Sequence, residues 1–187
     1  KTLCCYPTEP GFVAALTELT RAALAEATGH PRRRILFSAH GLPEKVVKSG
    51  DPYQWQVERA AEAVVAALAD IQSRVGPLKW IGPSTEDEIR RAGRDGAAAI
   101  VVPLAFVSEH SETLVELDIE YAHLAGEAGV PLYLRVPTVS SHAAFVAGLA
   151  RMVREALGRG TPGPCADGGN RICPPVWAGC VCRMAGT

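Results

Sequence analysis

The sequence lacks the features that mark nucleic-acid-binding, membrane-spanning and secreted proteins. Its 187 residues carry a formal net charge of -1, so it offers no electrostatic footprint for nucleic acid or an anionic membrane. The longest apolar run, residues 97–107, is too short to cross a bilayer and contains Pro103. No apolar leader follows Lys1, and no internal repeat is present. These absences predict a globular cytoplasmic domain without a transmembrane segment, cut from a longer chain.

Strand-like and helix-like segments alternate along the first 157 residues. Helical spacing of apolar residues covers residues 12–27, 52–69, 84–92, 108–126 and 141–157. Short apolar strands are expected at residues 34–39, 71–75, 97–106 and 132–136. Thr8 and either Ser84 or Thr85 are candidate N-caps. Short connections between alternating strands and helices predict an α/β, doubly wound domain over residues 1–157, with a mostly parallel, four-stranded sheet covered on both faces.

The tail, residues 158–187, is rich in Gly, Pro and Cys and has no periodicity. It carries the spacing Cys173-x6-Cys180-x-Cys182, with Cys165 upstream. Thiolates this close together suggest an iron–sulfur cluster or zinc, although the spacing fits neither a zinc ribbon nor a common ferredoxin. Structural disulfides are the weaker alternative without a secretory signal. The tail is predicted to be a separate cysteine-rich extension, and its shortness argues against a ferredoxin-like electron carrier.

One histidine follows a predicted strand directly. His40 comes after the strand at residues 34–39 and before a Gly-Leu-Pro turn. In open parallel sheets, sites form at the carboxyl ends of the strands, so this side chain is expected to face the crevice. Neutral imidazole can accept a proton or bind a metal near pH 7. The alternative is a half-buried histidine that only holds the turn.

A stripe of carboxylates follows the next long strand. Glu112, Glu116 and Glu120 recur every fourth residue, so they are expected to share one helix face beside His110. Like charges at this spacing repel by a few tenths of a kcal/mol per pair. Carboxylate and imidazole ligands suit Fe²⁺, so the stripe is a candidate path for a hydrated divalent cation. The spacing alone favours a solvated helix face. Asp118 is expected to lie on another face of the same helix and to point to solvent.

Four long blocks together resemble the ferrochelatase family. They are ILFSAHGLP (residues 35–43), GDPYQWQV (50–57), QSRVGPLKWIGPSTEDEI (72–89) and VVPLAFVSEHSETLVELDIEY (101–121). The blocks occur in the same order as in the family, and their amino-acid sequences are similar to those of its proteobacterial members. The resemblance implies a chelatase-like fold and a lyase that inserts Fe²⁺ into protoporphyrin IX to form protohaem. Coproporphyrin is the alternative substrate, and a half-domain that binds porphyrin or an iron–sulfur cluster without turnover is the alternative of another class.

The resemblance also implies roles for individual residues. His40 matches the family's active-site histidine, proposed as metal ligand or acceptor of pyrrole protons. Glu112 matches the essential glutamate that faces it across the porphyrin. Glu109, His110 and Glu116 match positions of the family's acidic metal path. Ser38, Trp80 and Gly82 lie in blocks that match the family's substrate-lining segments.

For the tail, the resemblance implies a 2Fe–2S cluster. Cys173, Cys180 and Cys182 match its three C-terminal ligands. In some relatives the fourth ligand comes from a cysteine well upstream, which would lie in the missing half, and Cys165 is the candidate replacement here. Cys4 and Cys5 are expected to be small residues at a strand or domain edge.

The chain departs from the family's pattern in two ways. It lacks the N-terminal domain, whose loops form the other lip of the porphyrin cleft, so that domain is an expected partner. The helix at residues 52–69 runs almost directly into Gln72, where the family has a loop and most of a strand, so the strand at residues 71–75 is expected to be shortened. A homodimer and peripheral membrane association are options that the resemblance leaves open.

Overall fold

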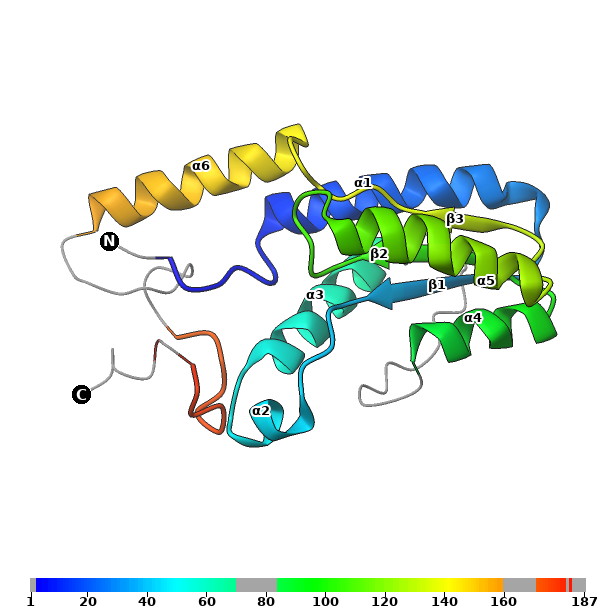
Figure 1. Cartoon of the computed structure of the whole chain (residues 1–187). Coiled ribbons are helices and arrows are strands. Elements are labelled where there is room, and N and C mark those ends of the chain that lie inside the picture. The colour runs from blue at the N-terminus through cyan, green and yellow to red at the C-terminus, as the bar shows by residue number, and fades with distance from the viewer. Residues whose placement is uncertain (1–2, 70–83, 160–170, 181, 183–187) are drawn as a thin grey trace.

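Three parallel strands form the sheet at the centre of the molecule (Figure 1). The computed structural model describes residues 3–69, 84–159, 171–180 and 182. Within them the strand order is β1 (Arg33–Ser38), β2 (Ala98–Pro103) and β3 (Tyr133–Arg135). Ile100 of β2 pairs with Ile35 on one side and Leu134 on the other. The predicted α/β fold with a parallel sheet is confirmed; the expected fourth strand, at residues 71–75, lies outside the described residues.

Helices cover both faces of this sheet. They are α1 (Pro10–Glu26), η1 (Ala27–Gly29), α2 (Glu44–Lys48), α3 (Tyr53–Ala67), α4 (Thr85–Arg94), η2 (Glu112–Glu120), α5 (Tyr121–Glu127) and α6 (Ala143–Gly158). α1 packs against α3 and α6, and α4 packs against α5 and the other side of β1 and β2 (Figure 1). The short helix α2 was not expected. No helix in the described ranges is both long enough and apolar enough to cross a membrane.

The core explains why β2 reads as an apolar run, because all six of its residues are buried. Side chains alternate across a strand, so they serve two separate layers. Ile100 joins Leu16 of α1 and Val64 of α3 in the main hydrophobic cluster. Ala99 points to the other face, where it packs with Ala92 of α4. The small alanines on that face let α4 approach the sheet closely.

Two N-caps fix how helices enter the fold. Ser84 accepts a hydrogen bond of 3.1 Å from the backbone N–H of Asp87, whose carboxylate accepts one in return, so the Ser84 cap is confirmed as a capping box. The prediction of Thr8 is wrong: Glu9 caps α1, accepting a bond of 2.7 Å from the N–H three residues later. Its other carboxylate oxygen lies 2.9 Å from Arg151. This ion pair ties the start of α1 to α6 and favours Glu9 over its neighbour.

The contact between α4 and the end of α5 depends on Gly93. A Cβ there would lie 2.0 Å from the carbonyl oxygen of Ala128. Backbone cannot yield as a flexible side chain can, so the two helices would have to separate. Overpacking costs about 1–3 kcal/mol and alanine returns up to about 1 kcal/mol of helix propensity. We expect Gly93→Ala to lower the free energy of unfolding by about 1–2 kcal/mol in urea titrations.

A matched glycine on α5 serves as the control. A Cβ at Gly126 would meet no heavy atom within 4 Å, so Gly126→Ala is expected to leave stability unchanged or to raise it slightly. Equal stability of the two variants would contradict the close approach at Gly93.

Candidate functional site

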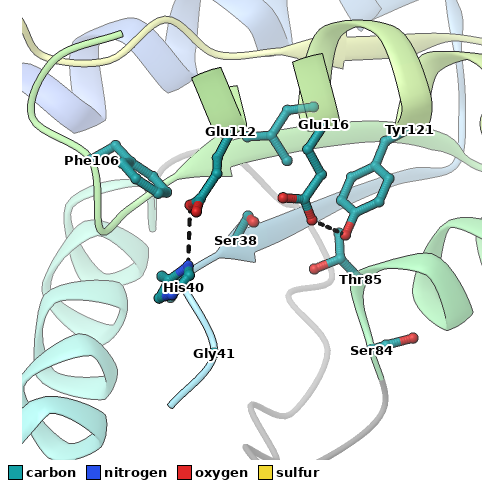
Figure 2. A pocket seen from close by; sticks show the side chains of 11 residues that line it. Ser38, His40, Gly41, Ser84, Thr85, Phe106, Glu112, Glu116 and Tyr121 are labelled. Atoms are coloured by element: carbon teal, nitrogen blue, oxygen red, sulfur yellow. Dashed lines mark hydrogen bonds and ion pairs between the residues drawn. The ribbon is translucent and has the colours of Figure 1, made fainter. Parts of the chain in front are cut away.

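The carboxyl ends of β1 and β2 open onto a cavity of about 260 Å³ (Figure 2). This is the edge at which open parallel sheets place their sites. The walls come from Ser38 at the end of β1 and residues 39–41 after it, Ser84 and Thr85 at the start of α4, Phe106 after β2, and Glu112, Glu116, Leu117 and Tyr121 on η2 and α5. Residues that lie far apart in the sequence therefore share one small space.

The cavity brings together His40 and Glu112, the two residues predicted to be catalytic. Nδ1 of His40 lies 3.1 Å from Oε2 of Glu112, and both side chains point into the cavity (Figure 2). The His40 side chain is 59% exposed and that of Glu112 36%, so the pair contributes little to stability. Its value is geometric: a carboxylate on Nδ1 orients the ring and leaves Nε2 available as a proton acceptor or metal ligand.

Glu116 continues the acidic wall on η2. The hydroxyl of Tyr121 donates a hydrogen bond to Oε1 of Glu116 (Figure 2). Burial and the nearby carboxylate raise the pKa of Tyr121, so the phenol keeps its proton and acts as a donor. Glu120, the third member of the expected stripe, is exposed and does not line the cavity. The η2 segment is a π-helix, a widened turn with i→i+5 hydrogen bonds that is frequent at functional sites.

Glu109 lies in a different environment from the other predicted path residues. It accepts hydrogen bonds from Nη1 of Arg135 at 2.7 Å, the N–H of Thr138 at 3.1 Å and the hydroxyl of Thr113 at 2.8 Å. Asp118 is exposed, as expected, and both of its carboxylate oxygens accept hydrogen bonds from the Arg135 guanidinium. This network joins the loop after β2 to β3 and to η2.

The pH dependence of stability can test this network. Burial alone would raise the pKa of Glu109, but the hydrogen bonds of Arg135, Thr138 and Thr113 outweigh it and hold the pKa below its usual value. A carboxyl group with a lower pKa in the folded chain stabilises it above the unfolded pKa, near 4.3, and that stabilisation is lost as the pH falls through the folded value. We expect Glu109→Gln to lower the free energy of unfolding by about 1–2 kcal/mol at pH 7.

The difference between Glu109→Gln and the unchanged chain should shrink when urea titrations are repeated from about pH 5 down to pH 3. Glu120→Gln, at an exposed position of η2, is the matched control and should show no such trend. If the difference in free energy of unfolding between Glu109→Gln and the unchanged chain were independent of pH, this result would contradict the lowered pKa of Glu109.

The remaining predicted site residues fall in three places. His110 stacks on Phe106, with ring centroids 5.6 Å apart and planes at 18°, so it lies behind a ring that lines the cavity. Ser38 lines the cavity itself at the end of β1. Trp80 and Gly82 lie outside the described residues.

Two tyrosines near the cavity were not predicted. Tyr121 ends the block that carries Glu112, but its spacing did not distinguish it from an ordinary helix residue. Tyr53 begins α3, and its buried hydroxyl makes no hydrogen bond of normal geometry to any described residue. Burial raises the pKa of Tyr53, the backbone of His40 lowers it and the charge of Glu112 raises it, so the hydroxyl lies near both residues. The only sequence signal for Tyr53 was its place in the GDPYQWQV block.

Five cysteines from the two ends of the chain form a second site. The Sγ atoms of Cys4, Cys180 and Cys182 all lie within 4.8 Å of one another. Sγ of Cys5 is 3.4 Å from that of Cys4, and both residues pack against the buried tail cysteines, Cys173 among them. Cys4 and Cys5, which were expected to be small residues at a strand or domain edge, therefore lie against the tail cysteines. Cys165 lies outside the described residues.

The chemistry of these donors suits a soft metal centre. Cys4, Cys5, Cys173 and Cys180 are free thiols, whereas Cys182 is disulfide-bonded. Burial raises the pKa of Cys4, Cys5 and Cys173, so without a metal these thiols hold their protons at neutral pH. Thiolates select zinc and iron–sulfur clusters, and a bound cation would supply the positive charge that buried thiolates need. The residues present fit such a group.

Comparison with known proteins gives a consistent result over the whole chain. A family model described as Ferrochelatase matches residues 1–157. Ferrochelatases of Phenylobacterium zucineum and Caulobacter vibrioides are each 50% identical, over 100% and 97% of this chain and 56% and 54% of their own lengths. The ferrochelatase of Rickettsia conorii is 41% identical over 98% of this chain and 55% of its own length. The chain thus spans little more than half the length of the curated relatives it matches.

Proposed function

The chain belongs to the ferrochelatase family, and from this premise we propose that it supplies one wall of an active site that inserts Fe²⁺ into protoporphyrin IX. The observation that carries the proposal is the His40–Glu112 pair, 3.1 Å apart at the mouth of the cavity. The cavity of about 260 Å³ is smaller than the roughly 300–1,000 Å³ of complete small-molecule sites. A second wall, from the part of the relatives that this chain does not span, would complete the porphyrin cleft.

The geometry divides the reaction between a proton acceptor and a metal-handling wall. Porphyrin must lose two pyrrole protons as the metal enters the ring. His40, oriented through Nδ1 by Glu112, presents Nε2 to accept a pyrrole proton, and the carboxylate stabilises the imidazolium that forms. Glu116, beside the Tyr121 hydroxyl, adds a carboxylate that can hold hydrated Fe²⁺, the substrate cation. Binding energy spread over both walls would bend the macrocycle and expose its nitrogen lone pairs.

The cysteine site belongs to the same proposal. The ligands of a 2Fe–2S cluster would be Cys4, Cys173, Cys180 and Cys182. Two observations support this assignment: these cysteines pack together, and the sulfurs of Cys4, Cys180 and Cys182 lie within 4.8 Å of one another. Cys182 would first have to be released from its disulfide bond by a thiol reductant. When bound, the cluster would supply a one-electron centre that also joins the N-terminal segment to the tail. A cytoplasmic location, a homodimer and the domain boundary at residues 157/158 remain predictions.

The second candidate function is a half-domain that binds porphyrin without turnover. The 59% exposure of the His40 side chain favours it for this chain taken alone. Coproporphyrin as substrate is the alternative within the enzyme class.

Zinc insertion, followed by the change in porphyrin fluorescence, distinguishes these candidates. We would assay the chain alone and a chimaera that joins it to the N-terminal part of the Phenylobacterium zucineum relative, with protoporphyrin and coproporphyrin in parallel. Faster insertion into protoporphyrin by the chimaera would support the proposal. A folded chimaera that binds protoporphyrin and inserts no zinc would favour the half-domain, and faster insertion into coproporphyrin would replace the substrate.

A further inference from the structure

The first turn of α3 lies beside the cysteine site. Nε2 of Gln56 donates a hydrogen bond of 3.3 Å to Sγ of Cys173. The tail is held against the same region by a backbone hydrogen bond of 2.9 Å from Gly179 to Gly50, in the turn before α3. Trp55 packs against the buried tail cysteines. In Figure 1 residues 171–180 of the tail accordingly run beside α2 and the start of α3.

We propose that Gln56 is a positioning residue of the cysteine site. Its side-chain amide fixes the Cys173 sulfur and, with an iron–sulfur cluster bound, raises the reduction potential of that cluster. This inference rests on the cluster proposed above, and it adds a residue that supplies no ligand.

The physical argument starts from burial. Cys173 is only 2% exposed, so water cannot replace the amide donor if Gln56 is removed. Reduction adds negative charge that is shared with the ligand sulfurs. An N–H donor aimed at one of these sulfurs stabilises the reduced form more than the oxidised form, and hydrogen bonds to sulfur are among the levers that set cluster potentials.

The donor is also held by a rigid element. Gln56 precedes Val57, which is buried in the main core together with Ala60 and Val64 of the same helix. The amide therefore approaches Cys173 from the folded domain, while the sulfur comes from the tail. A donor on a packed helix keeps its geometry when the charge on the sulfur changes, which a donor on a loose segment would not.

The same helix offers a matched control. Nε2 of Gln54 donates a hydrogen bond of 3.0 Å to Glu58, so this amide serves an ordinary pair along the helix. Gln54→Leu removes the same chemical group from the same turn without touching a sulfur. A general effect of losing an amide from α3 would appear in both variants.

The test measures the reduction potential and not catalysis. The full chain, Gln56→Leu, Gln56→Glu and Gln54→Leu would be reduced with a thiol, loaded anaerobically with ferrous iron and sulfide, and analysed for iron and sulfide content. A spectroelectrochemical titration then gives each midpoint potential. We expect a lower potential for Gln56→Leu, a still lower one for Gln56→Glu, which adds negative charge without a donor, and no shift for Gln54→Leu.

Each other result has a defined meaning. A fully loaded Gln56→Leu variant with an unchanged potential would overturn the role of Gln56 and leave the cluster in place. Equal shifts in Gln56→Leu and Gln54→Leu would overturn it as well. Should Gln56→Leu fail to fold, Gln56→Glu, which keeps length and polarity, carries the comparison with the unchanged chain. An unchanged chain that takes up no iron or sulfide would overturn both this inference and the cluster, while zinc insertion would still test the active site separately.

Discussion

His40→Ala is expected to lower the rate of zinc insertion into protoporphyrin by at least about 10²-fold, within the usual range for loss of a general base. Among the described residues that line the cavity, His40 is the only imidazole. Glu112, at 3.1 Å from its ring, can orient this base. The assay would use the chimaera with the N-terminal part of the Phenylobacterium zucineum relative, which adds the proposed second wall of the cleft.

The partner variant shows whether the two residues act as a unit. Glu112→Gln keeps the shape of the side chain and removes its charge, so the imidazolium formed on His40 loses its counter-charge. We expect kcat to fall with little change in KM, and the double variant to lose about as much as His40→Ala alone, because groups that act together are not additive.

His123→Ala is the matched control, because this histidine lies on α5, pairs with Glu127 and does not line the cavity. Insertion by folded His40→Ala at more than half the rate of the unchanged chimaera would remove the histidine from the mechanism.

Local patterns along the sequence were sufficient for the fold. β2 is buried on both faces, and α1, α3 and α6 are each buried on one face. Burial of this kind leaves an apolar pattern within the segment itself, so the pattern can be recognised without knowing which other segment packs against it. The placement of His40 at the end of β1 follows for the same reason, since parallel strands send their carboxyl ends to one edge.

Contacts between segments that lie far apart in the sequence could not be predicted from local patterns. Glu109 lies in the same short loop as His110, yet Arg135, 26 residues later, holds it away from the cavity. Glu116 and Glu120 of η2 both fit one helical stripe, yet Glu116 lines the cavity and Glu120 is exposed. Periodicity reports which face a residue takes within its own segment, and it says nothing about an arginine on another segment or about where along that face a cavity ends.

The cysteine site also depends on contacts between distant segments that the sequence pattern did not reveal. Cys4 and Cys5 belong to a short N-terminal segment without periodicity, so their sequence carried no sign of a partner 168 residues away in the tail. Their approach to Cys173 and Cys180 depends on α1 and α6 lying side by side, because these helices carry the two ends of the chain to the same region (Figure 1). Only the assembled core creates the set of donors.

Cys4→Ser is expected to abolish cluster binding, with iron and acid-labile sulfide falling to background after anaerobic loading. Sγ of Cys4 lies within 4.8 Å of both Cys180 and Cys182, whereas Cys5 approaches the tail through Cys173, which the proposal above already assigns as a ligand. Serine keeps the size of the side chain but replaces a soft thiolate with a hard, weakly acidic hydroxyl. Cys5→Ser is therefore the matched control and should retain iron, sulfide and visible absorption close to those of the unchanged chain.

The pattern of losses assigns the fourth ligand. Retention in Cys4→Ser with loss in Cys5→Ser would exchange the roles of the two neighbours, and retention in both with loss in Cys165→Ser would place all the ligands in the tail. Since Cys4 comes before α1 and its partners come after α6, a cluster that spans them closes the chain on itself. Its loss in Cys4→Ser should therefore also make the tail more sensitive to limited proteolysis, whereas a cluster held by the tail alone would leave that sensitivity unchanged.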